Sequence, residues 1–141
     1  MTLSAALCFG TAVFAHSGVK DPQVMARMHV MEDIARETKA LSAYANGSVA
    51  FDIAQVQRIG QALSNHAQAS LTLFKPPATD PKSEAKAIIW TDWEGFVAAN
   101  QLMMDAAEGV SRATSPEALQ ASFRALGQSC KACHKSYRIA K

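Results

Sequence analysis

The chain has 141 residues, of which 49% are hydrophobic and 18% charged, and its formal net charge at pH 7 is +2. This length indicates one domain with a buried core, and the hydrophobic content excludes an intrinsically disordered chain. The net charge is small and no basic run with interleaved aromatic residues occurs, so we expect no nucleic-acid partner.

The first fifteen residues carry no charge and read as the apolar segment of a signal peptide that ends at Val13-Phe14-Ala15. We therefore expect a signal peptide over 1–15, a mature domain over 16–141 and export to the bacterial periplasm. The segment is too short to span a membrane, so no stable membrane insertion is expected once it is removed. The segment lacks the basic residue that usually precedes the apolar run of a signal peptide. The alternative to a signal peptide is that these residues form a buried N-terminal helix.

Removal of the signal peptide also removes Cys8 and leaves two cysteines, Cys130 and Cys133. One close pair is not the pattern of a small secreted domain that is stabilised by several disulfides. The pair therefore needs another explanation.

Helix starts and stops divide the mature chain into four helices. Asp21-Pro22 and Ser115-Pro116-Glu117 each combine a capping side chain with proline at the first helical position. Asp52 with Gln55 resembles a capping box, and Ser83 is expected to cap the third helix. Stops are predicted at two places, Asn46-Gly47 and the proline-rich stretch 76–81.

Each predicted helix carries apolar or small residues at a spacing of three or four, which places them on one face. These stripes are Val24, Met28, Met31, Ala35, Thr38, Leu41 and Ala45; Val56, Ile59, Leu63, Ala67 and Phe74; Ile89, Trp93, Phe96, Asn100, Met103, Ala107 and Val110; Leu119, Phe123, Leu126, Cys130, Cys133 and Tyr137. No alternating β-branched runs occur. Four amphipathic helices bury their stripes against one another, so the predicted fold class is all-α, an antiparallel four-helix bundle.

The last helix contains the sequence Cys130-Lys131-Ala132-Cys133-His134. Residues three and four apart share a helix face, so both thiols and the imidazole point the same way. This spacing is typical of c-type haem attachment, with two thioether bonds and the histidine as an iron ligand. A redox pair would need a βαβ setting, a zinc site would need a fourth ligand, and a simple disulfide would leave His134 without a role.

The whole mature chain resembles the cytochrome c′ family, the class II c-type cytochromes, in which the haem motif lies near the C-terminus of a four-helix bundle. The resemblance is carried by Arg27 and Met31, Asn46-Gly47, Phe51-Asp52, Ile89-Trp90, Phe96 and the segment CKACHKSYR that starts at Cys130. It implies one covalent haem c with its iron on His134, near the C-terminal helix.

The family has a high-spin branch with an open iron site and a low-spin branch in which a methionine is the sixth ligand. The resemblance places Met31 at that position; Met28, one turn earlier, and a plain core role for the methionines are the alternatives. It also places Arg138 beside the proximal imidazole and Arg27 near a haem propionate. A solvated helix face is the alternative for either arginine.

These observations predict a periplasmic electron-transfer protein with His134 and Met31 as axial ligands. The alternative is a five-coordinate protein that binds nitric oxide or carbon monoxide. We expect no enzymatic activity, because no distal histidine or acid pair is clearly placed for a peroxidase. Redox partner proteins are implied, with a basic cluster as a candidate docking site. The cluster consists of Lys131, Lys135, Arg138 and Lys141. The alternative is a solvated helix end at which positive charges favour the helix dipole. The chain is a monomer or a homodimer.

Overall fold

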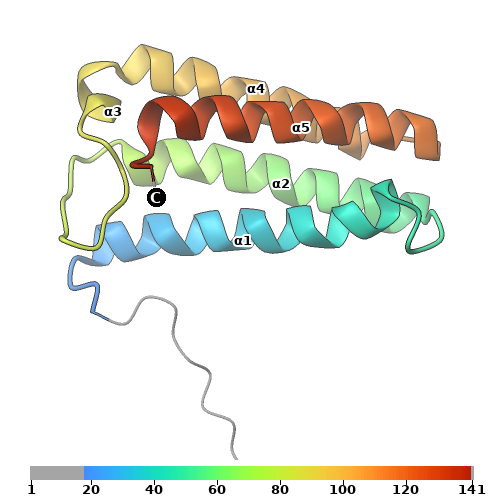
Figure 1. Cartoon of the computed structure of the whole chain (residues 1–141), viewed down its shortest axis with the longest axis horizontal. Helices are drawn as coiled ribbons and strands as arrows, with labels where there is room; N and C mark the ends of the chain where they lie inside the picture. The colour runs from blue at the N-terminus through green and yellow to red at the C-terminus, as the bar shows by residue number, and fades with distance from the viewer. Residues whose placement is uncertain (1–17, 141) are drawn as a thin grey trace, which may run out of the picture.

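The computed structural model describes residues 18–140, and the predicted signal peptide lies outside this range. It contains the long helices α1 (Pro22–Ala45), α2 (Ile53–Phe74), α4 (Trp93–Ser111) and α5 (Pro116–Tyr137) and the short helix α3 (Ile88–Thr91). The long helices run alternately up and down the molecule (Figure 1), which confirms the antiparallel four-helix bundle. None of the helices in this range is long and apolar enough to cross a membrane.

The side chains that we expect to cap the starts of α1, α2 and α5 do so. Asp21, Asp52 and Ser115 each accept the backbone N–H three residues on, at 2.9, 3.0 and 3.2 Å. These bonds satisfy N–H groups that a helix start otherwise leaves unpaired. Gly47 has a φ of +77° just after α1, and this conformation lets the chain turn toward α2.

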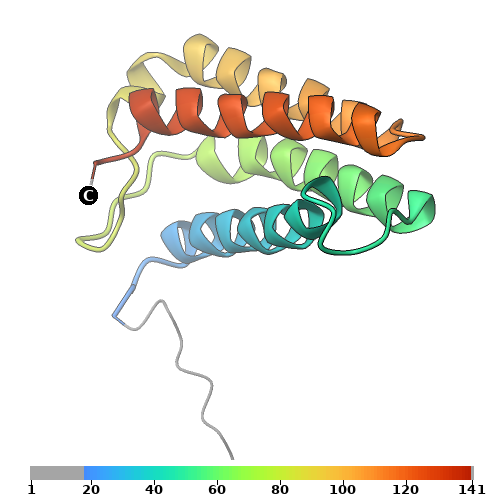
Figure 2. The ribbon, with the colours of Figure 1, turned by 45° about the vertical axis from the view of Figure 1, so that its right-hand side comes forward.

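The helices form a ring in which α1 contacts α2, α2 contacts α4, α4 contacts α5, and α5 closes back on α1. Figure 2, which is turned by 45°, shows the same arrangement of α1, α2, α4 and α5. The backbones of α2 and α4 approach closely: a Cβ added at Gly60 would lie 2.4 Å from the backbone nitrogen of Ser111. Across the same interface the buried Asn100 donates to the carbonyl of Ala67 at 2.9 Å.

The predicted stripe of α2 is buried at every position, but the predicted stripe of α1 is partly wrong. In α1 the side chains of Arg27, Val30 and Ile34 are buried, whereas Ala35 is exposed and Met28 is only half-buried. When small or flexible residues alternate at spacings of four and three, the pattern is compatible with two neighbouring faces of a helix. In α1 the buried face is the one that carries the branched Ile34.

The third predicted helix starts later than expected and is interrupted. Ser83 does not cap it; its hydroxyl accepts the N–H of Ala85 at 3.3 Å, and the helix begins at Ile88. Asp92 adopts φ −125° and ψ 52°, which separates α3 from α4. The chain before Ile88 instead pairs with the C-terminal segment, and this pairing shapes the candidate site.

Candidate functional site

The two cysteines lie on the inner side of α5 as free thiols, and both are half-buried. Cys130 packs against the main hydrophobic core, and Cys133 packs against a second cluster formed by Phe74, Ile89, Phe96 and Tyr137. Burial raises the pKa of both thiols, that of Cys133 to about 11, where the neighbouring Cys130 adds to the effect. A redox-active pair has a lowered thiol pKa, so these cysteines do not have the properties of a dithiol catalyst.

Met31 is the residue at which the two hydrophobic clusters meet. It is half-buried in α1 and packs against both the main core and the Phe74 cluster. Cys130 packs on the first cluster and Cys133 on the second, so the thioether of Met31 and the two thiols belong to the same region between α1 and α5.

His134 lies one residue after Cys133, in the last turn of α5, and is exposed. Its pKa is lowered, first by loss of solvation and then by the positive charge of Arg138, while the carboxylate of Glu84 acts in the opposite direction. A lowered pKa favours the neutral imidazole, which is the form that binds a metal.

Residues 84–86 pair with residues 137–139 to form an interaction that we call the clasp. The N–H of Ile139 donates to the carbonyl of Glu84 at 2.8 Å, and the N–H of Lys86 donates to the carbonyl of Tyr137 at 2.9 Å. The Arg138 guanidinium donates to Glu84 through Nε at 2.8 Å and Nη2 at 2.6 Å. The clasp therefore ties the chain before α3 to the end of α5, next to His134.

Tyr137 connects the same end of α5 to the start of α4. Its hydroxyl donates to Oδ2 of Asp92 at 2.7 Å, which raises the pKa of Tyr137 to about 12. Its ring packs edge-on against Phe96, with the ring centres 5.4 Å apart. A Cβ at Gly95 would lie 2.6 Å from the Tyr137 hydroxyl, so glycine is needed where this pair sits against α4.

Arg27 is buried in α1 and holds the chain that follows α2. Its guanidinium donates to the carbonyls of Leu73, Pro76 and Ala78 and lies 5.2 Å from the ring centre of Phe74. Burial lowers its pKa, and the charge of Asp21 acts in the opposite direction. No local sequence pattern predicts these carbonyl contacts.

One buried polar group of α1 has no partner among the residues that the structure describes. The hydroxyl of Thr38, two turns after Met31, is buried without a hydrogen-bond partner in this range, so it can bond to a group that is bound beside α1. Within residues 18–140 no group of three or more His, Cys, Asp or Glu side chains could hold a metal ion. The spacing of Cys130, Cys133 and His134 on α5 matches the separate attachment points that a porphyrin requires.

The family described as "Cytochrome C'" matches residues 22–138, the length of the bundle and the clasp. The chain belongs to the cytochrome c′ family. As a member of this family of haem-binding carrier proteins it binds one covalent c-type haem and is periplasmic.

Individual relatives agree with this assignment. The chain is 30% identical to cytochrome c-556 of Agrobacterium fabrum, over 99% of this chain and 96% of that protein. It is 37% identical to cytochrome c′ of Rhodospirillum rubrum over 53% of this chain, a match that spans only 58% of that relative. Among solved structures it resembles ferric cytochrome c prime from Alcaligenes xylosoxidans, with a TM-score of 0.77 and 26% identity over 84% of this chain and 94% of that one.

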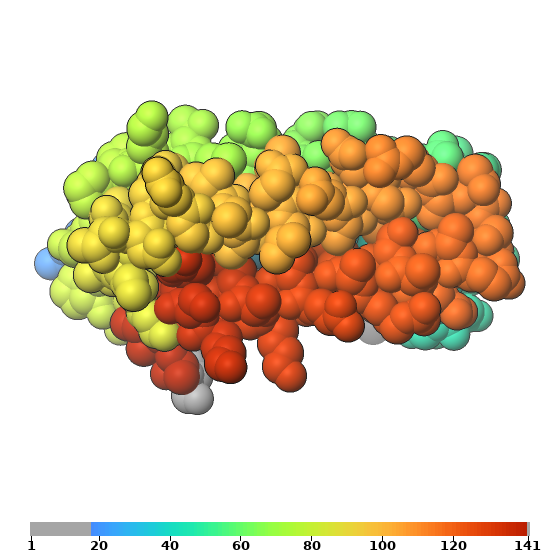
Figure 3. All heavy atoms as spheres, turned by 90° about the horizontal axis from the view of Figure 1, so that it is seen from above, coloured from blue at the N-terminus to red at the C-terminus, as the bar shows by residue number. Residues whose placement is uncertain are grey.

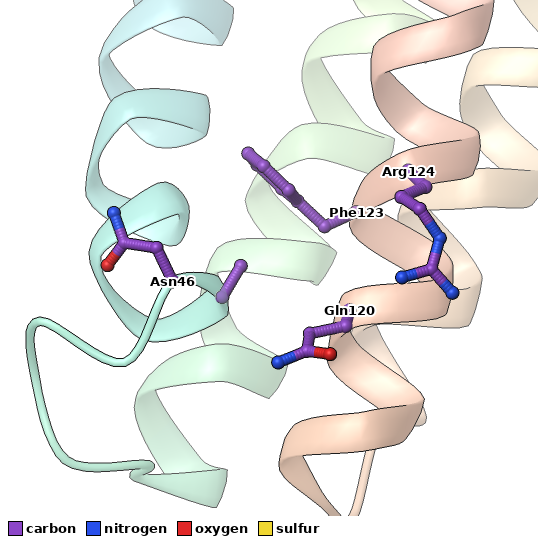
Figure 4. Close-up of a pocket in the computed structure, with 5 residues that line it drawn as sticks. Asn46, Gln120, Phe123 and Arg124 are labelled. Atoms are coloured by element: carbon purple, nitrogen blue, oxygen red, sulfur yellow. The ribbon is translucent and has the colours of Figure 1, made fainter.

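Two cavities of this cytochrome c′ family member are lined by neither the haem cysteines nor His134. One, of about 260 Å³, lies where α1 ends and α5 begins; there Phe123 points toward α1, while Arg124 points away from the space between the helices (Figure 4). The other, of about 570 Å³, follows the seam along which α4 and α5 lie side by side (Figure 3). It is lined mostly by small residues and reaches Ala132.

The sequence predicts the haem motif, and the role of Met31 as an iron ligand stays a prediction, whereas Glu84, Lys86 and Asp92 are not predicted. Lys86 donates through Nζ to the carbonyls of Lys135 and Ser136 at 3.1 and 3.2 Å, which supports the last turn of α5. These three residues lie about fifty positions before their partners in the chain, and no local pattern marks such distant pairs.

Proposed function

We propose that this protein is an electron carrier in which His134 and Met31 are the two axial ligands of the haem iron. The observation that carries the proposal is the position of Met31, which contacts the two hydrophobic clusters on which the haem cysteines pack. A covalently held haem supplies a one-electron couple, and a thioether opposite an imidazole raises its reduction potential. We propose no enzymatic reaction for the chain.

The surrounding residues keep the ligands in place. Cys130 and Cys133 fix the group to α5, while Tyr137 ties α5 to Asp92 and so to α4. Arg27 fixes the chain after α2 through its carbonyl contacts. Small movement of the ligands between oxidation states is what an electron carrier requires, and these contacts restrict that movement.

Arg27 and Arg138 are proposed to act on the haem by charge. Arg27 is buried, and its pKa is lowered by loss of solvation, so a propionate carboxylate would supply a counter-charge in addition to that of Asp21. The charge of Arg138 already reaches His134, since it lowers the pKa of that imidazole.

A redox partner with an acidic surface is proposed to dock near the end of α5. Lys131 and Lys135 are exposed there, whereas Arg138 is paired with Glu84 and Lys86 supports helix carbonyls. Lys141 lies outside the described residues. Exposed charges of this kind act mainly on the rate of association, so the binding is expected to weaken with salt.

The ligand assignment is tested by the optical spectrum of Met31→Ala. We expect a six-coordinate low-spin spectrum for the unchanged protein and a high-spin spectrum for the variant, because alanine cannot reach the iron. Met28→Ala is the matched control, since Met28 is also half-buried and lies one turn earlier; its spectrum should stay low-spin. An unchanged spin state in Met31→Ala contradicts the assignment, and a change in Met28→Ala instead would identify Met28 as the ligand.

The second candidate function is the binding of nitric oxide or carbon monoxide at an open iron site. The comparisons support this candidate more directly than the first: they include a nitric oxide complex of a cytochrome c prime variant from Alcaligenes xylosoxidans, with a TM-score of 0.77. A high-spin spectrum of the unchanged protein, together with rapid carbon monoxide binding after reduction, would favour it. Slow or absent binding would favour the electron carrier.

A further inference from the structure

Glu84 is the clasp residue whose side chain reaches the end of α5. Its Oε2 accepts hydrogen bonds from both Nε and Nη2 of Arg138, at 2.8 and 2.6 Å. Two bonds from one guanidinium fix its orientation as well as its position. The backbone of Glu84 is held independently, because its carbonyl accepts the N–H of Ile139 at 2.8 Å.

The clasp is joined directly to the turn of α5 that carries His134. Arg138 follows His134 by four residues, and its backbone N–H donates to the carbonyl of His134 at 3.0 Å. The Arg138 side chain therefore starts one turn from His134, and its two hydrogen bonds to Glu84 fix where its positive charge lies. Arg138 is 43% exposed at the side chain, and without a partner such a side chain would occupy many conformations in solvent.

We propose that Glu84 is a positioning residue that holds the Arg138 guanidinium beside His134, so that Arg138 influences the reduction potential of the haem only while Glu84 is present. This inference rests on the proposed ligation of the iron by His134. A fixed positive charge near the haem disfavours the ferric state and so raises the potential. A guanidinium released into solvent loses most of this influence because water and salt screen it.

The test is a double-mutant cycle in which the midpoint potential of the haem-loaded protein is measured. The four proteins are the unchanged protein, Glu84→Gln, Arg138→Gln and the double variant. We expect Arg138→Gln to lower the potential when Glu84 is present. The same substitution should produce a much smaller shift in the Glu84→Gln background, because the guanidinium is already displaced there. Equal shifts in the two backgrounds would overturn the inference, since Arg138 would then be positioned without Glu84.

A matched control is available in α4, where Arg112 Nη1 lies 2.9 Å from Glu108 Oε2 in another exposed ion pair. In a Glu108→Gln background the Arg138→Gln shift should keep its full size. A shift that shrinks equally in this background would show a general charge effect and overturn the role of Glu84. Both clasp side chains are partly exposed, so the variants are expected to fold, and each is checked by thermal unfolding.

A negative result in this cycle can be distinguished from a failure of the proposed function. All four proteins should retain the covalent haem and the spin state of the unchanged protein, so a failed cycle leaves the ligand assignment intact. Loss of covalent haem from the unchanged protein, or no effect of Met31→Ala, would instead remove the proposed function.

Discussion

The α2–α4 and α1–α5 interfaces of this bundle are built in different ways. Between α2 and α4 the backbones approach so closely that Gly60 has no room for a side chain, and the buried Asn100 is hydrogen-bonded to Ala67. Between α1 and α5 the cysteines are half-buried and the Thr38 hydroxyl lacks a partner. The comparison indicates that α2 and α4 pack directly against each other, and we expect the haem to complete the packing between α1 and α5.

Removal of the haem should have the largest effect and should separate the two interfaces. In a Cys130→Ser/Cys133→Ser variant without haem, we expect hydrogen exchange of α1 and α5 amides to accelerate by about 100-fold, or about 2.7 kcal/mol of local opening free energy. Amides of α2 and α4 should keep more of their protection, because their contact does not involve the cofactor. A uniform loss of protection along the chain would contradict the comparison.

Filling the close contact between α2 and α4 should have the next largest effect. Gly60→Ala places a Cβ 2.4 Å from the backbone of Ser111, and overpacking of this kind costs about 1–2 kcal/mol of unfolding free energy. Gly127→Ala is the control on α5, because its Cβ would meet no atom within 4 Å. The control should gain up to about 1 kcal/mol from higher helix propensity. Chemical denaturation of both variants checks this, and destabilisation of the two by the same amount would speak against it.

Tyr137→Phe should have a moderate effect that is confined to the contact between the end of α5 and the start of α4. The variant loses the hydrogen bond to Asp92 but keeps the ring against Phe96, so the expected cost is about 1 kcal/mol. The measurement is the unfolding free energy of Tyr137→Phe and Asp92→Asn, alone and combined. Because both variants act on one bond, their effects should not add; strict additivity would mean that the bond contributes nothing.

The smallest expected effect concerns Asp80, which ties the start of α1 to the chain after α2. Its carboxylate accepts the N–H groups of Lys82, Lys20 and Asp21, which lower the pKa of Asp80. A lowered pKa means that the stabilisation is present above the unfolded pKa and is lost as the pH falls through the folded pKa. We expect Asp80→Asn to be less stable than the unchanged protein at pH 7, and the difference to shrink under acidic conditions. A difference that is constant with pH would exclude the carboxylate as its cause.

The elements that sequence predicted well are those with local physical causes. The starts of α1 and α5 depend on Asp21-Pro22 and Ser115-Pro116, whose capping and proline effects act within one turn. The haem motif is equally local, because a helix by itself brings Cys130, Cys133 and His134 to one side.

The elements that sequence did not predict depend on distant partners. For Arg27 the resemblance predicts a position near a haem propionate, with a solvated helix face as the alternative. Neither predicts that Arg27 is buried with the carbonyls of Leu73 and Ala78 as acceptors of its N–H groups. The clasp likewise needs Glu84 and Arg138, which are brought together only when the chain before α3 returns to the end of α5. Such contacts arise from the tertiary arrangement, and no periodicity marks them.

The central claim is that α5 carries a porphyrin on Cys130 and Cys133, and the intact mass of the denatured protein tests it most directly. Protein matured in a host with functional haem-attachment machinery should be heavier than the polypeptide by one haem, and Cys130→Ser/Cys133→Ser should have the mass of the polypeptide alone. An unchanged protein from the same host that shows only the polypeptide mass would contradict the account.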